Sequence, residues 1–167
     1  MKTAMRFLLP VLLAVVCVAQ VRRSSELTKA QHLLWSVERR TLAILRGGAI
    51  DKVKLTGNIA ALTDAQKLDP AEVAIPTLIG SEYLILGKLE PARSAYFAAH
   101  RLEPRPEILL NLGKVGYSQG WHERAAHFFA QAVLLDPRMM KEVPEDFRAR
   151  VSDALRSQDD ADGANEN

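Results

Sequence analysis

The chain has 167 residues and a hydrophobic content of 48%, enough for one packed domain, and its one cysteine, Cys17, excludes a disulfide framework or a cysteine-rich zinc module. It carries 22 Lys and Arg against 20 Asp and Glu, and the excess comes from Lys2 and Arg6, which precede every acidic residue. Residues 22–167 therefore have no net charge, which excludes the basic excess typical of nucleic-acid-binding domains, and no nucleic-acid partner is expected.

Residues 1–23 have the pattern of a membrane-targeting segment. Residues 7–21 are apolar apart from Gln20, follow a short basic start and end at Arg22 and Arg23. Fifteen helical residues span roughly 22 Å, less than the roughly 30 Å of a hydrocarbon core. We therefore interpret the segment as a signal peptide or a short single-pass membrane anchor, rather than a buried core helix. Because long downstream domains cross membranes largely regardless of charge, we expect an inner-membrane-associated protein whose domain is periplasmic rather than cytoplasmic.

From Ser24 onward the apolar residues recur at helical spacing, and no segment shows the alternation of a strand. One stripe runs from Leu27 to Leu45, and a second runs from Ile50 to Leu68. Later helices are expected to open at four prolines: Pro76, Pro91, Pro106 and Pro144. The fold is therefore predicted to be all-α. The acidic tail 157–167 has no large apolar residue, and we expect it to be disordered.

An internal repeat with an offset of 33 residues is the strongest feature of the sequence. The matched positions are Gly80 with Gly113, Gly87 with Gly120, Ala92 with Ala125, Tyr96 with Phe129, Ala99 with Ala132, Leu102 with Leu135 and Pro104 with Pro137. Such a repeat predicts two antiparallel helices per unit. We expect the first glycine of each unit to let its helices approach across the alanines, the aromatic residue to face the next unit, and the second glycine to permit the turn.

This pattern resembles the tetratricopeptide repeat family over two repeats, 73–105 and 106–139. Tyr83 also stands at its family position, whereas the second repeat has Gly116 there. Residues 24–72 fit a degenerate N-terminal repeat in which Asn58 replaces the expected alanine. The resemblance implies a short α-solenoid, here 24–156, of antiparallel helix pairs. Its last open face would be covered by a capping helix, 144–156, which carries Phe147, Val151 and Leu155 at four-residue spacing.

The sequence gives no positive sign of catalysis or of metal binding. His122 and His127 resemble a zinc motif, but a spacing of five residues places their rings about 140° apart around a helix, whereas the metal site needs a spacing of four. No serine sits on a strand–turn–helix elbow. We expect a protein that is not an enzyme and that needs no cofactor or metal.

The resemblance implies that the first helices of successive repeats line a concave groove for a partner protein. By register, the groove-facing candidates are Thr77, Ser81, Leu84, Leu110, Asn111, Lys114 and Tyr117. For Leu84 and Leu110, the alternative is an ordinary core position. Trp121 is a second candidate, because it follows the turn glycine where the family usually has a polar residue. It is either an interface anchor or packed against the neighbouring loop.

These features predict a non-enzymatic protein–protein interaction scaffold of the bacterial cell envelope, which binds a segment of a partner protein in the concave groove. Two other interpretations stay open. In the first, the chain is a non-catalytic subunit of an envelope enzyme or of a complex for polysaccharide assembly or export. In the second, it is a structural protein that self-associates through its open ends.

Overall fold

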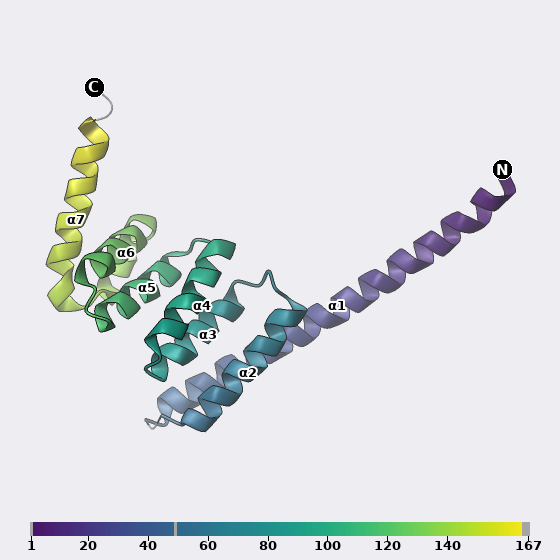
Figure 1. The fold of residues 1–167 in the computed structure, drawn as a ribbon, viewed down its shortest axis with the longest axis horizontal. Coiled ribbons are helices and arrows are strands. Elements are labelled where there is room, and N and C mark those ends of the chain that lie inside the picture. Colours follow the sequence, from purple (N-terminus) through teal and green to yellow (C-terminus); the bar gives the residue numbers. More distant parts are fainter. Residues whose placement is uncertain (1, 49, 165–167) are drawn as a thin grey trace.

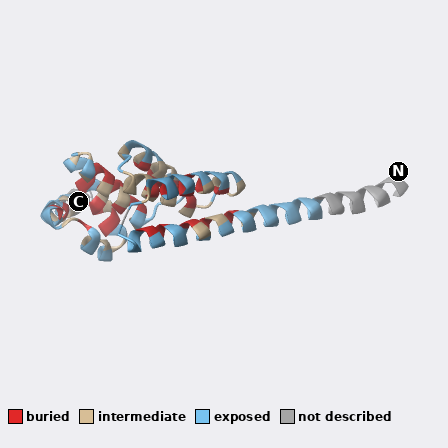
Figure 2. Cartoon of the chain, turned by 90° about the horizontal axis from the view of Figure 1, so that it is seen from below, coloured by how far each residue is buried: buried red, intermediate tan, exposed pale blue. Residues whose placement is uncertain are grey.

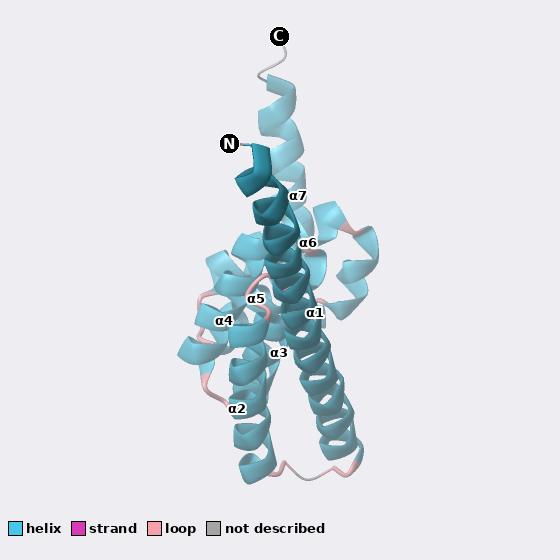
Figure 3. Ribbon diagram, turned by 90° about the vertical axis from the view of Figure 1, so that its right-hand side faces the viewer, coloured by secondary structure: helices cyan, strands magenta, loops and turns pink. Residues whose placement is uncertain are grey.

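The computed structural model describes the backbone of residues 2–48 and 50–164 and the side chains of 16–48 and 50–157. This part of the chain is helical nearly throughout and contains no strand, which confirms the all-α prediction (Figure 3). The elements are α1 (Lys2–Arg46), α2 (Lys52–Leu68), α3 (Ala74–Ile85), α4 (Leu89–Leu102), α5 (Pro106–Ser118), α6 (His122–Leu135), a 3-10 helix η1 (Pro137–Glu142) and α7 (Glu145–Ala164). Of the four prolines, only Pro106 holds the first position of its helix.

Helix α1 continues through the boundary that the sequence suggested at residue 23. Neither proline nor glycine occurs between Pro10 and Gly47, so nothing in the chain stops the helix. Its 45 residues span roughly 67 Å, and the N-terminal half extends away from the other helices (Figure 1). Residues 16–26 are exposed, and Ala30 is the first buried residue among the side chains described from residue 16 onward (Figure 2).

The expected targeting segment 7–21 falls largely on residues 1–15, whose side chains lie outside the described residues. Within the part of the chain that was described, no helix has both the length and the apolar character needed to cross a membrane. Membrane targeting therefore stays a prediction.

The remaining helices stack in chain order as antiparallel pairs (Figure 1). The C-terminal half of α1 packs against α2, α3 packs against α4, α5 packs against α6, and each pair contacts the next. Among the described side chains, three clusters of buried and partly buried apolar residues link α1 to α3, α3 to α5, and α5 to α7. Since each cluster contains residues of three consecutive elements, the pairs share a continuous core, as expected of a solenoid.

The repeat glycines act partly as predicted. Gly87 and Gly120 have φ of 71° and 74°, so they form left-handed turns between the paired helices. Gly80 and Gly113 do permit a close approach, but it is to an aromatic ring and not to the alanines. A Cβ atom at Gly80 would lie 2.7 Å from the Tyr96 ring, and one at Gly113 would lie 2.5 Å from the Phe129 ring. The two rings thus fill the space within their own pair, which corrects the expected packing.

Helix α7 caps the stack. Phe147 and Val151 are buried against α5 and α6, and Leu155 is half-buried, so these three side chains cover the last helix pair. The helix continues beyond residue 156 to Ala164, where the sequence suggested a disordered tail. The reason is that no proline or glycine occurs between Pro144 and Gly163. Residues 165–167 of that tail lie outside the described residues.

Candidate functional site

The hydroxyl groups predicted for the groove on α3 are used within the fold. Thr77 Oγ1 donates to the carbonyl oxygen of Val73 at 2.8 Å, one turn earlier in the chain. Ser81 Oγ donates to the Thr77 carbonyl and lies 3.0 Å from Tyr96 Oη, which links α3 to α4. Burial raises the pKa of Tyr96 to about 12, and the hydrogen bond to Ser81 opposes this shift. Ser81 is therefore a link between paired helices, whereas Thr77 is half-buried and keeps a partly open surface.

The two groove leucines behave as core residues, which was the alternative interpretation. Leu110 is 5% exposed and belongs to the cluster between α5 and α7. Leu84 is half-buried and packs against the cluster between α3 and α5. Both side chains stabilise the stack, and Leu110 has no surface left for a partner.

The candidates on α5 differ in what they contact. Asn111 is half-buried, and Lys114 Nζ lies 3.9 Å from Glu142 Oε2, which is a long and largely exposed ion pair. Tyr117 Oη donates to Asp146 Oδ2 at 3.0 Å, and its ring meets the Phe147 ring edge-on at 5.4 Å. The hydrogen bond to Asp146 and that carboxylate's charge raise the pKa of Tyr117. Tyr117, which was expected to face the groove, therefore also joins α5 to the capping helix.

Trp121 lies on the other side of the second repeat, at the start of α6. Its side chain is half-buried, and two guanidinium groups lie over its ring. The distance from the ring centroid to Cζ is 4.7 Å for Arg93 and 5.3 Å for Arg124. Such contacts stabilise by about 0.5–1 kcal/mol at exposed sites. Of the eight predicted residues, Trp121 alone borders the cavity described next.

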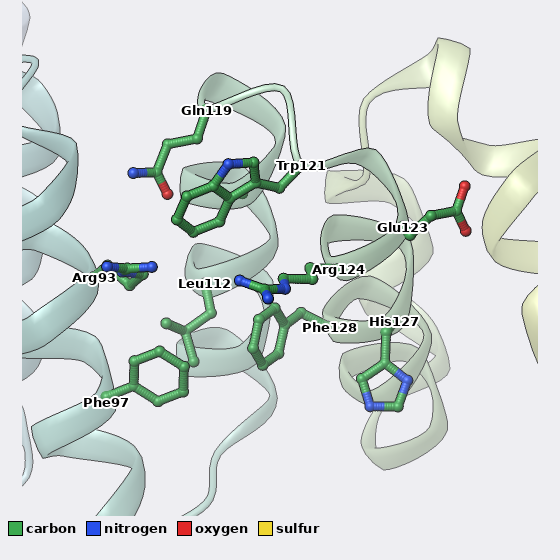
Figure 4. A pocket seen from close by; sticks show the side chains of 10 residues that line it. Arg93, Phe97, Leu112, Gln119, Trp121, Glu123, Arg124, His127 and Phe128 are labelled. Atoms are coloured by element: carbon green, nitrogen blue, oxygen red, sulfur yellow. The ribbon is translucent and has the colours of Figure 1, made fainter.

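A cavity of about 470 Å³ lies between α4 and α6, with α5 as its floor (Figure 4). We name it the α4–α6 cavity. Its wall is mainly apolar, and charged side chains stand at its rim. The lining residues are Arg93, Phe97, Leu112, Gly116, Gln119, Trp121, Glu123, Arg124, His127 and Phe128. The sequence did not predict this cavity, although Trp121 and Gly116 both depart there from the family pattern.

A second feature that the sequence did not predict is a buried carboxyl group among α1, α2 and α3. Glu82 is 0% exposed, and its Oε1 accepts a hydrogen bond from Thr41 Oγ1 and one of 3.3 Å from Asn58 Nδ2. Asn58 Nδ2 also donates to Thr41 Oγ1 at 3.1 Å. Burial raises the pKa of Glu82, against the effects of these two hydrogen bonds and of the charge of Arg40. The cluster explains the asparagine in place of the expected alanine at position 58.

Comparison with solved structures agrees with this architecture. The TPR domain of Arabidopsis OM64 matches with a TM-score of 0.60 and 16% identity, over 80% of this chain and 98% of that one. The first TPR domain of Spaghetti (RPAP3) matches with a TM-score of 0.58 and 21% identity, over 80% and 93% of the two chains. A thermophilic TPR protein of Thermus thermophilus matches with a TM-score of 0.52 and 23% identity, over 84% and 68%.

No family model matches the sequence, and no curated protein is significantly similar to it. At 16–23% identity, the structural matches establish the fold and not a function. Their agreement with the internal repeat and with the observed helix pairs leads to one conclusion. The chain has the fold of a tetratricopeptide-repeat domain.

Proposed function

We propose that this chain is a non-enzymatic scaffold that holds a partner protein through its helical repeats. Two structures of the same fold support the proposal, because they contain bound peptides. One is the first TPR domain of Spaghetti (RPAP3) with an HSP90 peptide, and the other is the second TPR domain of human RPAP3 with an HSP70 peptide. The observation that carries the proposal for this chain is an open surface between its helix pairs, with side chains that no described element covers.

On the face formed by the first helices, the partner segment lies against Thr77, Asn111 and Lys114. These three side chains are half-buried, so each keeps part of its surface for a partner. Ser81, Leu110 and Tyr117 support this face from within the fold and do not contact the partner. Lys114 is the charged group of the face, and its long ion pair with Glu142 leaves it able to pair with an acidic group instead.

We place this scaffold at the bacterial cell envelope, with its domain on the extracytoplasmic side. The apolar stretch 7–21 between a basic start and Arg22 supports this placement, either as a cleaved signal peptide or as an anchor. The exposed residues 22–26 of α1, which follow the segment, would separate the domain from the membrane if the segment is retained.

Crosslinking in cells, followed by purification of the full chain from solubilised membranes, tests the proposal. Recovery of a different, non-enzymatic protein in fixed ratio supports the scaffold. Recovery of a catalytic subunit, or of components for polysaccharide assembly or export, favours the alternative of a non-catalytic subunit. Recovery of this chain alone would contradict the proposal and favour self-association. A Lys114→Glu variant tests the first-helix face, because charge reversal there should reduce recovery of the partner without unfolding the chain.

A further inference from the structure

We propose that the α4–α6 cavity is a second binding site, which takes a partner segment with a large apolar side chain beside carboxylate groups. This inference rests on the proposed function and assigns a chemical class to the partner. It concerns the side of the stack where α4 and α6 lie, not the first-helix face.

The floor and walls of the cavity select an apolar side chain. Phe97 of α4 and Phe128 of α6 are half-buried, and their rings meet edge-on at 5.9 Å. Leu112 of α5 lies on the floor between them (Figure 4), and Gly116 of α5 also lines the cavity. The volume of about 470 Å³ lies within the range of roughly 300–1,000 Å³ typical of ligand pockets, so it accommodates one or two large side chains.

The rim of the cavity selects carboxylates. Arg93 and Arg124 flank Trp121, and among the described side chains neither guanidinium lies within 4.0 Å of a carboxylate. Glu123 also borders the cavity, but its carboxylate pairs with Arg150 at 2.9 Å and with neither of these two arginines. Two guanidinium groups at the edge of an apolar site favour a partner carboxylate, since arginine binds carboxylates through paired hydrogen bonds.

The first repeat provides a comparison within the same chain. At the position equivalent to Gly116 it has Tyr83, whose ring packs against the two clusters on either side of α3. At the position equivalent to Trp121 it has Lys88. The second repeat therefore replaces a space-filling residue by glycine and adds an aromatic side chain at the rim. Helix pairing requires neither change, because the first repeat forms the same pair without them.

Other occupants fit the cavity less well. The acidic tail 157–167 has carboxylates but no large apolar side chain, so it cannot fill the floor. A basic segment would be repelled by the positive charges of Arg93 and Arg124. An amphipathic small anion, such as a fatty acid, shares the chemistry of the proposed segment, and the experiment below separates it from a peptide.

The test measures anisotropy of a fluorescein-labelled nine-residue peptide with a central phenylalanine between two glutamates on each side, titrated with the full chain. We expect saturable binding, no binding of the matched peptide with lysines for glutamates, and weaker binding of the peptide with serine for phenylalanine. Arg93→Glu with Arg124→Glu should weaken binding at least about tenfold, and so should Trp121→Lys, which restores the residue of the first repeat. Arg101→Glu on α4 and Trp35→Lys on α1 are matched controls that should bind as the unmodified chain does, because neither residue lines the cavity.

Several results would overturn the inference. The first is that the acidic peptide does not bind when the chain is at about 1 mM. The second is that the lysine peptide binds as tightly as the acidic one. The third is that the cavity variants and the control variants change the affinity for the acidic peptide equally. Displacement of bound peptide by sodium dodecanoate or by a peptide of residues 157–167 would assign the cavity to that occupant, and dimerisation of the chain alone in analytical ultracentrifugation, abolished by Trp121→Lys, would assign it to a second copy. Circular dichroism of Trp121→Lys separates lost binding from lost folding. If the acidic peptide does not bind while crosslinking still recovers a partner protein, this inference is wrong and the proposed function stands. If the peptide does not bind and crosslinking recovers no partner protein, the proposed function is wrong as well.

Discussion

Two glycines of α5 allow the tight packing of the second repeat to be measured. A Cβ atom at Gly113 would lie 2.5 Å from Phe129 Cδ1 and from Cε1, which is far inside normal contact, and the Phe129 ring is 0% exposed and cannot move into solvent. A Cβ atom at Gly116 would have Ala125 as its nearest neighbour, at 3.4 Å. Both glycines lie within the helix, so replacing either by alanine gains about the same helix propensity, about 1 kcal/mol.

The difference between Gly113→Ala and Gly116→Ala therefore isolates the clash with Phe129. Overpacking of this kind costs about 1–3 kcal/mol, so we expect Gly113→Ala to be less stable than Gly116→Ala by that amount. For a chain of this size the difference corresponds to a shift of about 2–12 °C in the melting temperature measured by circular dichroism at 222 nm. In a Phe129→Leu background the difference should shrink, because the ring that the added methyl group would meet is gone. Equal melting temperatures for the two alanine variants would refute the proposed packing.

Other predictions concern the buried carboxyl group and the capping helix. Because burial raises the pKa of Glu82, the folded chain holds that proton to a higher pH than the unfolded chain and loses stability as the pH rises through this interval. Urea unfolding of Glu82→Gln should therefore show a gain over the unmodified chain that grows from about pH 4 to pH 8, and a constant difference would contradict the assignment. Tyr117→Ala should lower the melting temperature, since it removes the contacts with Asp146 and Phe147, whereas Asn111→Ala should leave it nearly unchanged. Deletion of residues 145–167 should cause aggregation visible by light scattering, because it uncovers the cluster around Phe129, while deletion of 158–167 should not.

The fold was predictable from the sequence because its signals are local and repeated. Gly87 and Gly120 mark the turns, and Phe147 and Val151 mark the cap, so each element could be placed from its own residues. The long α1 was not predicted as one helix, since the charge pattern at Arg22 and Arg23 suggests a boundary that the backbone does not require.

The candidate site was less predictable, because register alone does not say which side chains meet. Tyr117 and Ser81 occupy first-helix positions that the family resemblance assigns to a groove, yet their partners, Asp146 and Tyr96, come from other elements. The α4–α6 cavity likewise depends on Phe97 and Phe128, which lie 31 positions apart and come together only when α4 and α6 pack on α5. The polar cluster around Glu82 unites three helices, and no spacing in the sequence indicates it.

Site-specific photocrosslinking tests the central claim, that this chain holds a partner protein on its helical repeats, most directly. A photoreactive amino acid is placed at His127, in the α4–α6 cavity, or at Asn111, on the first-helix face, and the full chain is irradiated in its own cells. The exposed Lys29 on α1 is the control position, away from both surfaces. We predict an adduct with a different protein at one or both test positions and none at Lys29. Adducts at no position, or equally at all three, would contradict the claim.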